Sequence, residues 1–71
     1  MTFVALKSST LAAIQYDEGT SALSVRFKGG GEYEYSGVPE NIYQGILKAA
    51  SAGKYFDLHV KKGGYRFRQV N

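Results

Sequence analysis

Apolar and polar residues alternate on both sides of a three-glycine run in residues 23–38, LSVRFKGGGEYEYSGV. Alternation with a period of two places one set of side chains in the interior and the other in solvent, so the stretch predicts a β-hairpin. A three-residue loop at Gly29, Gly30 and Gly31 would place apolar residues opposite apolar ones, and basic residues opposite acidic ones. The expected cross-strand pairs are Lys28 with Glu32, Phe27 with Tyr33, Arg26 with Glu34, and Val25 with Tyr35.

The same alternation in residues 11–17 predicts a strand before the hairpin. Gly19 and Thr20 lie in a polar run that predicts the connecting turn. The apolar residues 1–6 are expected to form an extended lead-in. Together these segments predict a three-stranded antiparallel meander. The first strand is expected to pair with the second, with Ala12 opposite Phe27, Ile14 opposite Val25, and Tyr16 opposite Leu23.

The apolar spacing becomes helical after Pro39. Glu40 and Lys48 suit the two ends of a helix dipole, so we expect a helix over residues 39–50, with Pro39 in its first turn. Ser51 would cap a short second helix over residues 52–60, and residues 65–69 would form a final strand or an extended tail. The expected fold is therefore α+β, and the first helix covers the meander with a stripe of apolar residues, Ile42, Tyr43, Ile46, Leu47 and Ala50.

The 71 residues suffice for one domain, expected to span residues 1–71. The chain contains no cysteine, no apolar run near the roughly 20 residues that span a bilayer, and no signal-peptide pattern, so a cytoplasmic protein is expected. The net charge of +3 is unevenly distributed, because residues 1–47 sum to −2 and residues 48–71 to +5. A basic end of this kind is compatible with polyanion binding and also with solubility alone.

The basic end contains the main candidate site, in which basic and aromatic residues are interleaved. Basic side chains can hold phosphates and aromatic rings can stack on bases, so the pattern suggests a nucleic-acid surface. A solvated basic end is the alternative. The candidate nucleic-acid-binding residues are Lys54, Tyr55, Lys61, Lys62, Tyr65, Arg66 and Arg68.

Other candidate sites have simpler structural interpretations. The three glycines lead into Glu32 and a strand instead of a helix, which argues for a hairpin tip over a phosphate loop. Tyr33 and Tyr35 could form a stacking platform, but the helix stripe needs the same face, which favours a place in the core. The adjacent Ser8 and Ser9 could be a site, although local backbone hydrogen bonding at the strand entry is the stronger reading.

No set of residues in the sequence suggests catalysis. His59 is the single histidine, and Asp57, two positions away, would point to another face of a helix. Neither a metal-ligand set nor a nucleophile with its base can be argued from these spacings. We therefore expect a protein that is not an enzyme and has no catalytic residue, metal or cofactor.

Several spaced elements occur together in one order along the chain. They are Ser8-Ser9-x-Leu11-Ala12-Ala13-Ile14-x-Tyr16-Asp17, Leu23-x-Val25-x-Phe27, Tyr33-x-Tyr35-x-Gly37-Val38-Pro39, Ala50-Ser51-x-Gly53-Lys54-Tyr55-Phe56, and Tyr65. This order resembles the KTSC domain, named for the C-terminal extension of some lysyl-tRNA synthetases and also found as short stand-alone bacterial and phage proteins. The resemblance covers about residues 8–65, and the double glycine at Gly63 and Gly64 departs from it.

The resemblance implies a compact module for which RNA binding has been suggested, and it assigns no catalytic residue. Together with the charge asymmetry, it favours a small non-catalytic module that binds RNA or another nucleic acid through the basic C-terminal third. The alternative is a protein-interaction adaptor or regulator, of phage or prophage origin, that binds a host protein. No membrane partner is expected, and the sequence sets no oligomeric state.

Overall fold

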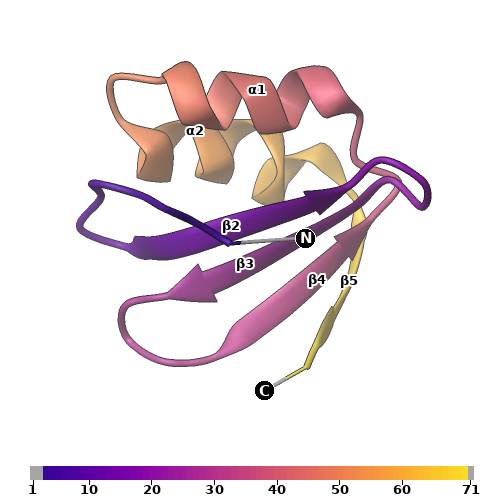
Figure 1. Cartoon of the computed structure of the whole chain (residues 1–71), viewed down its shortest axis with the longest axis horizontal. Helices are drawn as coiled ribbons and strands as arrows, with labels where there is room; N and C mark the ends of the chain where they lie inside the picture. The colour runs from indigo at the N-terminus through magenta and orange to yellow at the C-terminus, as the bar shows by residue number, and fades with distance from the viewer. Residues whose placement is uncertain (1–2, 71) are drawn as a thin grey trace.

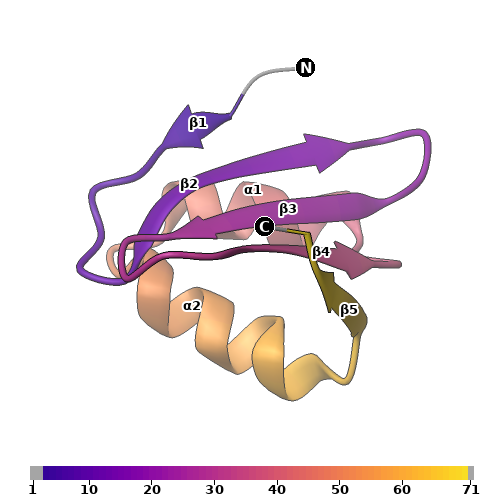
Figure 2. The same ribbon diagram turned by 90° about the horizontal axis from the view of Figure 1, so that it is seen from below.

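The alternating segments form the central antiparallel meander, made of β2 (Leu11–Asp17), β3 (Ala22–Phe27) and β4 (Glu32–Ser36). Two edge strands extend it, with β1 (Val4–Ala5) beside β2 and β5 (Arg66–Gln69) beside β4 (Figure 2). The computed structural model describes residues 3–70, so Met1 and Thr2 of the predicted lead-in, and Asn71, lie outside the described residues.

The α+β fold with an antiparallel meander is confirmed, but the meander is longer than the three strands predicted, because residues 3–70 form a sheet of five in the order β1-β2-β3-β4-β5. The described end of the lead-in pairs with β2 through Val4 opposite Ile14. The C-terminal segment is a strand and not a free tail, since Phe67 lies opposite Tyr35. Both added strands satisfy backbone groups that β2 and β4 would otherwise leave unpaired at the edges.

The β3–β4 hairpin has the predicted faces but not the predicted pairs. Arg26 lies opposite Glu32, and Val25 opposite Tyr33, two residues away from the expected register. The loop begins one residue early, because the Phe27 amide donates to the Gly31 carbonyl at 3.1 Å and the left-handed geometry falls on Gly30 and Gly31. A shift of two residues preserves the face of every side chain, so the apolar face remains inward.

The β2–β3 pairing confirms Ile14 with Val25 and Tyr16 with Leu23. The predicted place of Ala12 opposite Phe27 was wrong, since Leu11 occupies it and the register shifts between Leu11 and Ala13. Such a bulge adds one residue to a strand and re-aims the neighbouring side chains. The larger Leu11 thereby enters the interior, where it is only 1% exposed.

Both predicted helices are present, on one face of the sheet (Figure 1). Helix α1 (Glu40–Lys48) is shorter than expected, with Pro39 as its extended N-cap and Ala50 exposed beyond its end. Helix α2 (Ala52–His59) is capped as predicted, because the Ser51 hydroxyl accepts from the Lys54 amide at 3.4 Å. After Val60, the chain forms the short 3-10 helix η1 (Lys61–Gly63).

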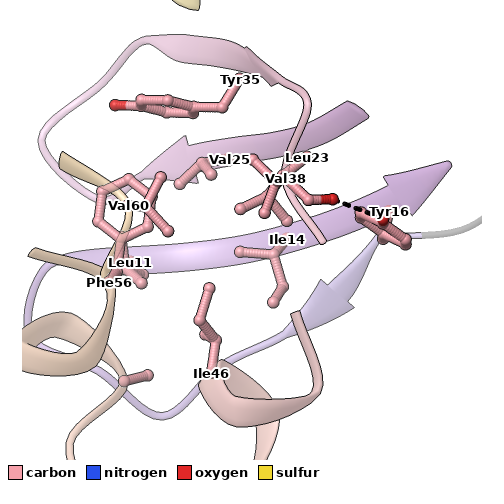
Figure 3. Packing of buried hydrophobic residues seen from close by; sticks show 11 residues of the cluster. Leu11, Ile14, Tyr16, Leu23, Val25, Tyr35, Val38, Ile46, Phe56 and Val60 are labelled. Carbon is pink, nitrogen blue, oxygen red and sulfur yellow. Dashed lines mark hydrogen bonds between the residues drawn. The ribbon is translucent and has the colours of Figure 1, made fainter. Parts of the chain in front are cut away.

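The core lies between the helices and the inner face of the sheet (Figure 3). Phe56 of α2 packs edge-on against Tyr35, whose ring centroid is 5.4 Å away. Tyr16 is also buried, and its hydroxyl donates to the Val38 carbonyl at 2.6 Å. The prediction that Tyr35 belongs to the core is confirmed. The buried apolar residues are Leu11, Ile14, Tyr16, Leu23, Val25, Tyr35, Val38, Ile46, Ala52, Phe56 and Val60.

Candidate nucleic-acid interface

The fold distributes the predicted basic residues over two faces of the molecule. Lys54, Lys61 and Lys62 lie on α2 and η1, on the helical side of the sheet. Arg66 and Arg68 lie opposite Ser36 and Glu34 on the outer face, which is turned away from the helices. The two arginines therefore share one face of β5, but the basic end does not form one surface.

The three lysines line a groove of about 640 Å³ that runs between residues 7–11 and α2. Lys7 lines the opposite wall, so four exposed lysines surround it, and we call it the lysine groove. Among the described residues, its single lining carboxylate is Asp57, which lies 3.7 Å from the Lys62 ammonium. Both side chains of this pair are exposed, so water screens their attraction. The groove therefore has a net positive charge suited to phosphate.

Local hydrogen bonds shape the wall of the lysine groove that precedes β2. The Ser8 hydroxyl accepts from the backbone amides of Thr10 and Leu11, each at 3.2 Å. The structural reading of Ser8 is therefore confirmed, while Ser9 is exposed beside it. Helix α2 comes close to this turn because Gly53 has no side chain, and a Cβ there would lie 2.6 Å from the Thr10 hydroxyl oxygen. Ser8 therefore fixes the shape of one wall of the groove, and Gly53 allows the other wall to approach it closely.

The two predicted aromatic partners of the lysines do not line the lysine groove. Tyr55 is half-buried, and its ring contacts the tilted ring of His59, with centroids 4.2 Å apart. Its hydroxyl lies against Gly45 of α1, where an added methyl group would overlap it. Tyr65 is half-buried beside Gly63. Both tyrosines therefore stabilise local packing, and neither offers a free ring face to the groove.

A second hollow, of about 550 Å³, opens where the helices leave the inner face of the sheet uncovered. We call it the aromatic hollow, and the sequence did not predict it. Phe67 of β5 is 61% exposed at its rim, which is unusual for a large aromatic side chain. Phe27 and Lys61 line both hollows, so the two lie next to each other. The lining residues of the aromatic hollow are Phe27, Gly30, Tyr33, Tyr35, Lys61 and Phe67.

The lone histidine has a local role in the described structure. His59 is exposed and its ring contacts that of Tyr55, whereas Asp57 lies beside Lys62. Within residues 3–70, no group of three or more histidine, aspartate and glutamate side chains is placed to hold a metal ion.

None of the helices in this range is long and apolar enough to cross a membrane.

The Tyr35 hydroxyl provides a test of the core beneath the aromatic hollow. Burial raises the pKa of this phenol above its ordinary value of 10.0, and the charge of Tyr33 raises it further. The unfolded chain therefore loses the proton first as the pH rises. This contribution to stability is complete below about pH 10 and is lost as the pH rises through the folded-state pKa.

We expect the free energy of unfolding to fall more steeply above about pH 10 in the wild type than in Tyr35→Phe. Urea titrations at a series of pH values, followed by circular dichroism, would measure both slopes. Phenylalanine keeps the ring that packs on Phe56, so the comparison isolates the hydroxyl. Equal slopes in the two proteins would show that Tyr35 ionises as easily in the folded chain as in the unfolded one.

Comparison with solved structures gives a close structural relative. A KTSC domain protein from Yersinia pestis, solved by crystallography, matches with a TM-score of 0.89 and 34% sequence identity. The match covers 99% of this chain and 97% of that protein. Its fold and length therefore agree with those of the present chain almost throughout.

Sequence relatives include short proteins and one segment of larger enzymes. An uncharacterized protein of Stutzerimonas stutzeri is 37% identical over 68 residues, covering 96% of both chains. A lysine–tRNA ligase of Nostoc punctiforme is 29% identical over 65 residues, which cover 92% of this chain but 11% of the ligase. A model of the KTSC domain family matches residues 7–67. With a match over most of its length, the chain belongs to the KTSC domain family.

Proposed function

We propose that this domain is a small non-catalytic module that binds RNA through the lysine groove. The observation that carries the proposal is the convergence of Lys7, Lys54, Lys61 and Lys62 on one groove, where Asp57 is the one lining carboxylate in the described part of the chain. Lysine ammonium groups bind phosphates as point charges, and such contacts supply most of the sequence-independent affinity for nucleic acids. The similar segment in lysine–tRNA ligases supports an RNA instead of another polyanion.

The outer-face arginines have a weaker part in this proposal. The Arg68 guanidinium already lies 3.1 Å from the Glu34 carboxylate, so its charge is partly compensated. Arg66 is exposed on the same face. Both arginines add to the attraction that steers an RNA toward the molecule, whereas the lysines make the contacts in the complex. Tyr55 and Tyr65 support the fold of this region.

A titration of the labelled domain with an RNA of about ten nucleotides tests the proposal by NMR. We expect shifts in the lysine-groove walls, residues 7–10 and 52–62. If all four lysines contact phosphates, affinity should fall about 50-fold between about 50 and about 200 mM salt, because binding releases counterions. No shifts at the lower salt concentration, or shifts confined to the outer face of β5, would contradict the proposal.

The alternative function is a protein-interaction adaptor, and one feature favours it. Strand β5 is an edge strand, and it is accompanied by the exposed side chains of Phe67 and Val70. A strand of another protein could pair with such an edge. Pull-down from a nuclease-treated lysate separates the two functions, because a stoichiometric protein that is retained at high salt would support the adaptor.

A further inference from the structure

The aromatic hollow presents ring surface that the core does not use. Phe67 lies near Tyr35 and Tyr33, with ring centroids 5.3 and 6.0 Å away, yet 61% of it remains exposed. Tyr33 is itself only half-buried. The Phe27 ring packs edge-on against Tyr33, with ring centroids 5.6 Å apart. The hollow is thus an open cluster of three rings above the buried Tyr35, with room for another planar group.

The charge at the aromatic hollow identifies the kind of group that it suits. The Lys61 ammonium lies 6.0 Å from the centre of the Phe27 ring, and within residues 3–70 no carboxylate lines the hollow. Lys61 also lines the lysine groove, so a chain of phosphates in that groove would end beside the rings. An aromatic ligand that carries negative charge therefore complements this surface better than a neutral or cationic one.

We propose that the aromatic hollow binds one unpaired nucleobase, stacked on Phe67, while Lys61 contacts a neighbouring phosphate. This inference rests on the proposed RNA binding and narrows it to single strands. A base inside a duplex is covered by its neighbours, so it cannot offer a face to Phe67, whereas an unpaired base can. Stacking does not depend on the edges of the base, so the site accepts all four bases with modest preference.

The variant Phe67→Ala tests the stacking site. Because the side chain is largely exposed, its removal should leave the fold intact, which a thermal unfolding curve would verify. The probe is an RNA of about ten nucleotides with one fluorescent 2-aminopurine, whose emission is quenched by stacking. We expect Phe67→Ala to weaken binding about 5- to 150-fold and to reduce the quenching.

Phe3→Ala is the matched control, since it removes the same side chain elsewhere. The Phe3 ring lies 3.8 Å from the guanidinium of Arg26, which belongs to the outer face of the sheet. We expect this variant to bind the RNA as the wild type does, with the same quenching. An equal loss in both phenylalanine variants would overturn the stacking site, because the effect would then not depend on the hollow.

A second comparison uses the wild type with a normal RNA and with a strand of the same length that lacks bases. We expect weaker binding of the abasic strand, and weaker binding of a duplex of the same sequence. If salt-sensitive binding persists but Phe67→Ala and the abasic strand bind normally, the lysine groove stands and the base site is wrong. If no strand binds even at low salt, both the RNA function and the base site are wrong.

Discussion

Phe56→Ala is expected to remove about 3–5 kcal/mol of stability, the usual loss for truncating a buried aromatic side chain. Phe56 is 2% exposed and packs edge-on against Phe27 and Tyr35, at 5.7 and 5.4 Å. A chain of 71 residues is expected to have a total stability of about 4–10 kcal/mol. The substitution should therefore remove a large share of the total and leave a readily unfolded protein.

Urea denaturation followed by circular dichroism measures this loss, with Leu58→Ala as its control. Leu58 lies on the same helix but is 60% exposed, so its truncation should change stability by less than about 0.5 kcal/mol. The contrast separates the loss of packing from any effect of alanine on the helix. Similar midpoints for the two variants would mean that α2 does not anchor the core through Phe56.

The strand faces could be predicted from the sequence, whereas the register of the hairpin could not. Every one of the three glycines can adopt a positive φ, so the loop can begin at Lys28 or at Gly29. Both registers keep Val25 and Tyr33 on the inner face, so the alternation does not distinguish them. The pairing of charges does not identify the register either, because Glu34 forms its ion pair with Arg68 of β5.

Strand β1 was not predicted, and β5 was predicted only as a strand or a tail, because the pairing of both depends on residues far away in the sequence. Strand β1 has two residues, too few to show a period. Strand β5 alternates clearly, but nothing local shows whether it joins β4 or remains a tail. Only the path of α2 and η1 across the inner face brings β5 back to the sheet (Figure 2).

The candidate site was predictable in its charges but not in its shape. Lys54, Lys61 and Lys62 stand out as a basic end, but their separation from Arg66 and Arg68 follows from the pairing of β5. Lys7 was missed, because it reaches the lysine groove through the turn built on Ser8. The alternation of β5 does place Phe67 on the inner face, but only the structure shows that the helices leave it uncovered.

Reversal of three groove charges, in Lys54→Glu/Lys61→Glu/Lys62→Glu, is expected to weaken RNA binding about 100-fold at low salt. Each exposed charge is estimated to change the binding free energy by about 1 kcal/mol when it is reversed. The dependence of affinity on salt should also become shallower, because fewer phosphates are neutralised. All three side chains are exposed, so the fold should persist. Fluorescence titrations at several salt concentrations would measure both changes.

The decisive control reverses three exposed charges elsewhere, in Lys48→Glu/Arg66→Glu/Arg68→Glu. Each reversal lowers the net charge by 2, so both triple variants change it from +3 to −3 and have the same overall repulsion for RNA. Lys48 lies at the end of α1, and the arginines lie on the outer face of the sheet. If the lysine groove holds the phosphates, the affinity of the control variant for RNA should fall roughly tenfold or less. Its salt dependence should remain that of the wild type. Equal losses in the two variants would mean that the RNA responds to the total charge, and the groove would then have no special role.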